Sequence, residues 1–88
     1  MDFEFDIQKS YTNKQKHGID FHQAQKLWLD ENSIIIPAKN TDDETRFAII
    51  GFINHKCWVG IFTIRDYNYR IISVRRCRNY EEKQYESR

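Results

Sequence analysis

The sequence predicts an α+β domain in which two N-terminal helices and a short C-terminal helix pack on one face of a mainly antiparallel β-sheet. Apolar residues recur at helical spacing through the first 32 positions, and runs of β-branched and aromatic residues replace them afterwards. Two connectors between these runs, "NH" and "DYN", are short enough for antiparallel hairpins. This order, helices first and hairpin-linked strands afterwards, favours the α+β class.

The first helix is expected to follow Asp6, which is a suitable N-cap residue. Residues 3–5, "FEF", form either a short strand or an extended lead-in to it. Gly18 fits the C′ position that ends the helix, because glycine adopts the left-handed conformation at no steric cost. The residues at helical spacing between these two positions are Ile7, Tyr11 and Lys14.

A second helix is expected over residues 20–32, "DFHQAQKLWLDEN". Asp20 is its N-cap, and Gln23, three residues later, completes a capping box. The helix then carries one apolar stripe, made of Phe21, Ala24, Leu27 and Trp28.

The strands begin with "SIIIP", a β-branched run that ends at Pro37 and suits a sheet edge. The polar loop of residues 38–45, "AKNTDDET", precedes three longer runs rich in strand-forming residues, at 46–53, 56–65 and 69–78. In the final segment, "NYEEKQYES", Asn79 as N-cap and Glu82 at N3 predict a short helix.

Length and composition indicate a single globular domain over residues 1–88. Apolar residues make up 40% of the chain and charged residues 31%, which is typical of soluble proteins. No apolar run approaches the roughly 18 residues of a membrane span, and "MDFEFD" does not resemble a secretory signal. Cys57 and Cys77 form no CxxC motif, so we expect reduced thiols in a cytoplasmic protein.

Charge is distributed unevenly along the chain, although the net charge is only +1. Residues 1–45 hold five Lys and nine Asp or Glu, whereas residues 46–88 hold nine Lys or Arg and four Asp or Glu. All seven arginines lie in the second half. This asymmetry predicts a surface that faces a polyanion, or two halves of the domain that attract one another.

The arginines concentrate in "RIISVRRCR", within the last expected strand. Strict alternation places Arg70, Arg76 and Arg78 on one face of that strand and Arg75 on the other, unless a bulge intervenes. Alternation alone therefore does not bring them together. Residues 65–78 contain five arginines and one acid, Asp66, a ratio that favours phosphate binding over ion pairs for the group. Nearby aromatic residues suited to stacking on RNA bases are Trp58, Tyr67, Tyr69 and Tyr80.

Several motifs spread over essentially the whole chain carry a family resemblance: "FEFD", "NKQKHGIDFHQAQKLW", "DDETRF", "TIRDYNYRIISVRRCR" and "YEEKQYES". In this order they resemble the BrnT family of bacterial type II toxins, which are small ribonucleases with a RelE-like fold. The combination "KHGI.F..A" with a later "R.IS.RR" is specific in a chain of this length. Three positions depart from the family pattern: Phe5 and Ile7 replace Trp and Pro, and Cys77 replaces a small residue, usually Ala.

The resemblance implies metal-independent RNA cleavage that inhibits translation, with no cofactor. It also implies neutralisation by a BrnA-like antitoxin with a ribbon-helix-helix domain, through which the complex contacts operator DNA. Such cleavage activates a ribose 2′-hydroxyl, and the transition state gains negative charge on phosphoryl oxygens. Arginine cannot serve as a general base, so its role is to stabilise that charge. The arginines that match the resemblance are Arg65, Arg75 and Arg76.

Proton transfer is the second chemical requirement of the reaction. His17 is a candidate because histidine is the residue type used most often for proton transfer in catalysis, although a histidine beside Gly18 equally stabilises a helix C-terminus. Glu82 is a possible base with a competing capping role. Four further residues are expected to contact RNA, each with a structural alternative: Lys14 (a solvated lysine), Arg46 (an ion pair with "DDE"), Arg78 (a solvated strand residue) and Tyr85 (packing).

Two other classes of function compete with a ribonuclease. A non-catalytic RNA- or DNA-binding module would use the same arginines for positioning, and would bind with a steep salt dependence but form no product. An interaction domain would dock an acidic partner on the basic half. Metal sites are not expected, because the histidines and cysteines lack zinc-site spacing, and Asp42, Asp43 and Glu44 lack that of an EF-hand.

Overall fold

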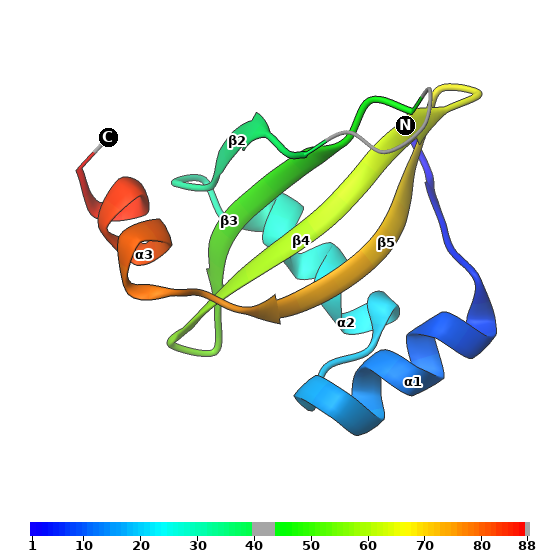
Figure 1. Ribbon diagram of the computed structural model, residues 1–88, viewed down its shortest axis with the longest axis horizontal. Coiled ribbons are helices and arrows are strands. Elements are labelled where there is room, and N and C mark those ends of the chain that lie inside the picture. The colour runs from blue at the N-terminus through cyan, green and yellow to red at the C-terminus, as the bar shows by residue number, and fades with distance from the viewer. Residues whose placement is uncertain (40–43, 88) are drawn as a thin grey trace.

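The structure, a computed structural model, describes residues 1–39 and 44–87 and has an α+β fold (Figure 1). The strands are β1 (Phe3–Glu4), β2 (Ile34–Pro37), β3 (Phe47–Ile53), β4 (Lys56–Arg65) and β5 (Asn68–Arg76). The helices are α1 (Ile7–His17), α2 (Phe21–Ala24), the 3₁₀ helix η1 (Gln25–Leu29) and α3 (Asn79–Glu86). The five strands form one sheet in the order β1-β5-β4-β3-β2. Among the strands of the described residues, β1 and β5 alone pair in parallel, so the predicted α+β class and the mainly antiparallel sheet are confirmed.

The predicted caps of the first helix are present in α1. The Asp6 carboxylate accepts a 3.0 Å hydrogen bond from the backbone N–H of Lys9. Gly18 has φ +80° and donates its N–H to the oxygen of Lys14. Glycine suits this position because other residues incur a steric cost in the left-handed region.

The second helix keeps its predicted start but is shorter than expected. Asp20 and Gln23 form the predicted capping box, yet α-helical geometry ends at Ala24 and the chain continues as the 3₁₀ helix η1. A 3₁₀ helix has three residues per turn, so side chains three positions apart line up. Ala24 and Leu27 lie three positions apart and are both fully buried. The 3₁₀ turn therefore places both side chains on the side of the chain that faces the core.

Two apolar clusters occupy opposite faces of the sheet, as the alternation in β3 shows. Ile49 belongs to the cluster that contains the α2 and η1 residues Phe21 and Leu27, whereas Ile50 belongs to the other cluster. Tyr85 of α3 packs with this second cluster. The expectation that all helices share one face is therefore wrong for α3, because the chain leaves β5 and packs behind the sheet.

A β-bulge shifts the register between β4 and β5. Phe62 pairs with Ile71 but Ile61 pairs with Ser73, which leaves Ile72 as the extra residue on β5. Ile71 and Val74 consequently lie in the same core cluster, although strict alternation would place them on opposite faces.

The side chain of Asn13 in α1 is hydrogen-bonded to the edge of β5 beyond the reach of β1. Its amide group donates to the oxygen of Val74 at 2.9 Å and accepts from the N–H of Val74 at 3.1 Å. It also donates to the oxygen of Ile19 at 2.8 Å. Since β1 pairs with Tyr69 and Arg70, Asn13 fixes α1 against the part of β5 that lies beyond these two residues.

No helix within the described residues has the length and apolar character that crossing a bilayer requires.

Candidate nucleic-acid interface

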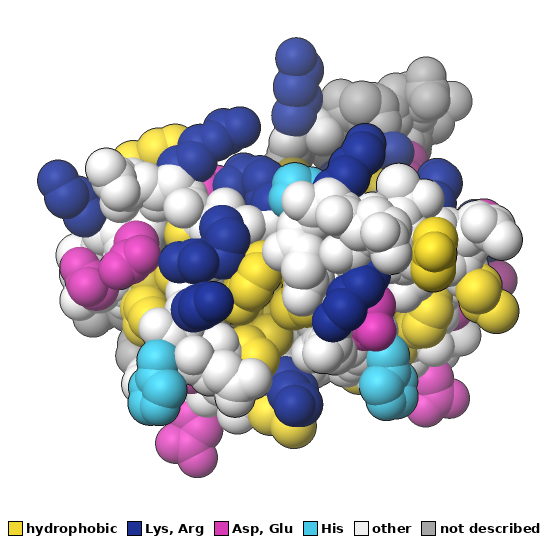
Figure 2. Space-filling view, turned by 90° about the horizontal axis from the view of Figure 1, so that it is seen from below, with side chains coloured by type: hydrophobic (Ala, Val, Ile, Leu, Met, Phe, Trp, Pro, Cys, Tyr) yellow, Lys and Arg dark blue, Asp and Glu magenta, His cyan; other side chains and the backbone are white. Residues whose placement is uncertain are grey.

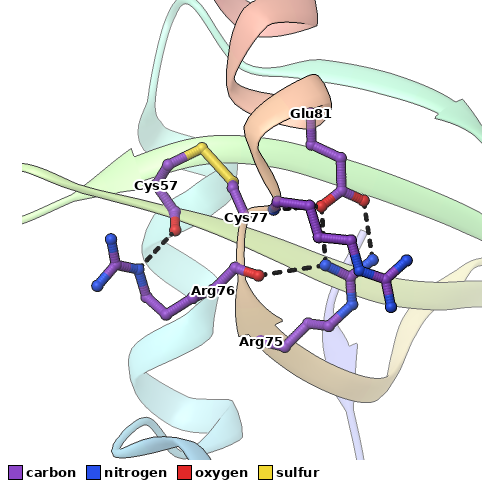
Figure 3. A network of polar contacts seen from close by, with 6 residues as sticks. Cys57, Arg75, Arg76, Cys77 and Glu81 are labelled. Atoms are coloured by element: carbon purple, nitrogen blue, oxygen red, sulfur yellow. Dashed lines mark hydrogen bonds and ion pairs between the residues drawn. A yellow bond between two sulfur atoms is a disulfide. The ribbon is translucent and has the colours of Figure 1, made fainter.

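Arg76 lies at the end of β5 opposite Trp58, its partner in β4. The centre of its guanidinium is 5.4 Å from the Trp58 ring centroid, which is within cation–π range. Its Nε donates a 3.0 Å hydrogen bond to the backbone oxygen of Cys57 (Figure 3). Because Arg76 is otherwise exposed, these two contacts present an oriented cation at the surface.

Arg75 faces the other side of the sheet and is bound by Glu81 of α3 (Figure 3). Its two terminal nitrogens donate to the two carboxylate oxygens of Glu81, each at 2.8 Å, in a bidentate pair. Glu81 is only 5% exposed. This hydrogen bonding raises the pKa of Arg75 and lowers the pKa of Glu81 from their ordinary values. Both groups are therefore charged, and Arg75 is held in one orientation.

The same carboxylate begins α3, and this corrects the predicted capping residues. The backbone N–H of Arg78 donates to Glu81 at 2.7 Å, so Arg78 is the N-cap and Glu81 is N3. The prediction had Asn79 and Glu82, one residue later in each case. Glu81 holds the capping position because its carboxylate also binds Arg75, which a local pattern cannot reveal.

A disulfide joins Cys57 in β4 to Cys77 just after β5 (Figure 3). The expectation of two reduced thiols is therefore wrong for this structure. The register that pairs Trp58 with Arg76 also sets Cys57 opposite Cys77, and their Cα atoms lie 5.4 Å apart, within the usual disulfide range. Had the register continued from Phe62 and Ile71 without a bulge, Ile61 would pair with Ile72 and Cys57 would face Arg76, so the bulge makes this bond possible.

Arg65 lies at the other end of the sheet. Its Nε is 3.4 Å from the Glu4 carboxylate, which Arg70 approaches at 3.6 Å. Val59, the partner of Arg75, is six residues from Arg65 along β4, a separation of about 20 Å. The structure thus does not bring Arg65 together with Arg75 and Arg76.

Arg46 also lies toward that distant end, since the next residue, Phe47, pairs with Phe62. Its Nε is 3.3 Å from the Glu44 carboxylate, which agrees with the ion-pair alternative. The other acids of the "DDE" motif, Asp42 and Asp43, lie outside the described residues.

The remaining candidates occupy different surroundings. Lys14 reaches across the α1–α2 junction, with its Nζ 3.1 Å from the side-chain oxygen of Gln23. His17 is exposed and lines a small cavity between α1 and the bulge of β5. Tyr85 donates to the Asp30 carboxylate at 2.9 Å and contacts the ring of Phe52 with centroids 5.0 Å apart, as the packing alternative expects.

A basic hollow adjoins Arg76, and its lysines were not among the predicted site residues. It is lined by Lys26 of η1 and Lys56 of β4 together with Trp58. Figure 2 shows Lys and Arg side chains around exposed apolar side chains on this end of the molecule. Lys26 and Lys56 lie 30 positions apart as single lysines, so no local pattern indicates their proximity.

Comparison with known families gives a match over most of the chain. The family model described as the ribonuclease toxin BrnT of a type II toxin–antitoxin system matches residues 5–81. The comparison with curated proteins finds no match. Type II toxins of this family have an RNA substrate and an antitoxin partner. Because the match omits only four residues at the start and seven at the end, the chain belongs to the BrnT family of ribonuclease toxins.

Proposed function

We propose that this protein is a metal-independent endoribonuclease that cleaves RNA through attack of a ribose 2′-hydroxyl on the adjacent phosphorus. The 2′-hydroxyl gives its proton to a base and its oxygen forms a bond to phosphorus, while the bond to the 5′-oxygen breaks and that oxygen takes up a proton. The products are a 2′,3′-cyclic phosphate and a 5′-hydroxyl. The observation that carries the proposal is the oriented guanidinium of Arg76 beside a hollow lined with lysines. Permanent cations at fixed positions stabilise the charge that develops on the phosphoryl oxygens.

We assign that stabilising role to Arg76 first. Arg75 is already bound by Glu81, so we assign it to positioning the end of β5. Arg65 lies about 20 Å along β4 from Val59, the partner of Arg75. This position suits a contact to the RNA backbone rather than to the reacting phosphate. His17 is the proposed proton-transfer residue, because an imidazole changes charge near neutral pH.

Lys14 and Arg78 are the proposed RNA contacts nearest this end of the sheet, and both are exposed. Arg46 would contact RNA only at the opposite end. We assign Tyr85 to packing, since its hydroxyl binds Asp30.

The cellular role that we propose is translation inhibition by a single cytoplasmic domain of residues 1–88 with a RelE-like fold. A BrnA-like antitoxin with a ribbon-helix-helix domain would neutralise it and would carry the complex to operator DNA. The family match supports a toxin with an antitoxin partner, and the resemblance described above supplies the finer assignments.

The test is incubation of the purified protein with a long RNA in EDTA, beside the variants Arg76→Ala, Arg75→Ala and Arg65→Ala. We expect new 2′,3′-cyclic phosphate ends with the parent and a loss of about 10²–10³-fold in rate for Arg76→Ala, the cost of removing one charge-stabilising group. Arg65→Ala should weaken RNA binding more than it slows the chemical step. Circular dichroism of each variant controls for folding.

Two outcomes would contradict the proposal. A folded Arg76→Ala variant that cleaves at the parent rate would remove Arg76 from the reaction. Salt-dependent RNA binding without any product, on RNA that is naked or loaded on ribosomes, would favour the non-catalytic binding module.

A further inference from the structure

The basic hollow lies where the α1–α2 junction meets the β3–β4 hairpin. Its volume is about 190 Å³, and its lining includes Gln23, Lys26, Asn54 and Lys56. Pockets that enclose a whole drug-sized ligand are larger, about 300–1,000 Å³. A hollow of this size therefore fits one unit of a longer ligand rather than a complete small molecule.

Its rim is cationic. Lys26 and Lys56 line it directly, and Lys14 reaches it through the 3.1 Å contact between its Nζ and Gln23. Arg76 covers the Trp58 ring on the same side of the sheet. None of the described residues that line the hollow is acidic. Cations gathered at a concave surface without acids focus positive potential there and attract anions.

Its inner wall is apolar and rigid. Ile19, Ile53 and Trp58 line it and also belong to the larger core cluster, with exposed fractions of 8% or less. An apolar wall beside cations matches a nucleotide, whose base has apolar faces and whose phosphate is anionic. A free phosphate would make no use of the wall.

We propose that this hollow is a nucleotide subsite, which binds an RNA residue next to the phosphate that Arg76 contacts. Lys26 and Lys56 bind the phosphate of that nucleotide, and its base lies against the wall of Ile19, Ile53 and Trp58. The assignment rests on the proposed function for its substrate class. It extends that function by naming where the flanking part of the substrate is bound.

The test measures binding separately from cleavage. A fluorescent single-stranded oligonucleotide with 2′-O-methyl riboses has no 2′-hydroxyl to attack, so its anisotropy reports affinity alone. The variants are Lys26→Gln and Lys56→Gln, and the matched control is Lys83→Gln, which removes an exposed lysine from α3. All three positions are exposed, so the fold is retained. Lys26→Arg restores the charge.

Each hollow variant should lower the affinity about three- to tenfold at low salt and decrease the slope of log K against log[salt] by about 0.7, the value for one phosphate contact on a single strand. Lys83→Gln should leave the slope unchanged, and Lys26→Arg should restore most of the affinity. An oligomer of the same backbone without bases should bind the parent more weakly than the complete oligonucleotide, because it cannot use the apolar wall.

The outcomes separate the two proposals. Cleavage by the parent with unchanged affinity and slope in Lys26→Gln and Lys56→Gln would overturn the subsite and leave the ribonuclease intact. Affinity lost in both variants from a parent that cleaves nothing would support the subsite and overturn the reaction. Equal losses in Lys83→Gln would reduce the hollow to general surface charge and would also overturn the subsite.

Discussion

Glu81→Gln tests how strongly the Arg75–Glu81 pair holds α3 on the sheet. The substitution keeps the size of the side chain but removes the charge, so one of the two 2.8 Å bonds to Arg75 loses its acceptor and the other becomes a bond to a neutral oxygen. Hydrogen bonds between charged groups contribute about 1.5–3 kcal/mol each. Arg75 retains partial access to water, with 29% of its side chain exposed, so the expected loss for the pair is about 2 kcal/mol in the free energy of unfolding.

Urea denaturation at pH 7 measures this loss. With a slope near 1 kcal/mol/M for a chain of this size, about 2 kcal/mol lowers the midpoint by about 2 M. The thermal midpoint should fall by about 8–16 °C. Glu82→Gln, the same change at the next position of α3, is the matched control and should alter the midpoint little. A double-mutant cycle with Arg75→Ala isolates the interaction energy of the pair.

The pH dependence provides an independent check. The pKa of Glu81 is lower in the folded protein than in the unfolded chain, so its stabilisation is complete above the unfolded value of about 4.3. It is lost as the pH falls through the folded value. The difference between the parent and Glu81→Gln should thus be constant from pH 7 to about 5 and shrink below about 4. A Glu81→Gln midpoint equal to that of Glu82→Gln at pH 7 would refute the reasoning.

Three further changes should destabilise the fold for different reasons. Reducing the Cys57–Cys77 disulfide, which spans 20 positions, should lower the free energy of unfolding by about 3 kcal/mol, because the unfolded chain gains freedom. The thermal midpoint measures this loss. A double serine variant has no disulfide to reduce, so a midpoint of that variant that still responds to reductant would argue against this reasoning. Asn13→Ala leaves the buried N–H and C=O of Val74 without their partner, and should lower the free energy of unfolding by about 3 kcal/mol. Urea denaturation measures this, and a loss below about 0.5 kcal/mol would contradict the role of Asn13. Phe21→Ala leaves a cavity where a side chain that is 1% exposed had been, and should lower the free energy of unfolding by about 3–5 kcal/mol. Calorimetry measures this loss, and a midpoint close to that of the parent would contradict it by showing that the core closes over the cavity.

The local elements were predictable because their determinants lie a few residues apart. Asp6 caps a backbone group three residues away, Gly18 bonds to Lys14, and Asp20 forms its capping box with Gln23. Such patterns need no knowledge of the tertiary fold. The N-cap of α3 was misplaced by one residue because Arg75, from another element, selects its glutamate.

The register of β5 was not predictable from alternation. One extra residue, Ile72, reverses the phase of the strand halfway along it. The residues after the bulge acquire their partners from that shift: Arg76 meets Trp58, and Cys77 meets Cys57. Nothing in the local pattern of β5 marks the bulge, so the pairing of Cys57 with Cys77 was not predictable.

The candidate site was predictable in chemistry but not in geometry. The excess of arginines over acids in residues 65–78 indicated phosphate binding. Arg75 and Arg76, which are adjacent in the sequence, do lie at one end of the sheet. Arg65 lies at the other end of the sheet, because six residues of β4 separate it from Val59, the partner of Arg75. A count of arginines in residues 65–78 cannot show this separation. The lysines of the hollow come from η1 and β4, and only the packing of these elements brings them close.

The hydrogen bonds of Asn13 also close part of an open strand edge. An open strand edge is a template onto which a second chain can add a strand, and natural proteins block such edges. Asn13 presents one donor and one acceptor to Val74, as a neighbouring backbone would, so a single side chain occupies the position of an added strand. At Val74 the edge of β5 therefore offers neither its N–H nor its carbonyl oxygen to a strand from a second chain.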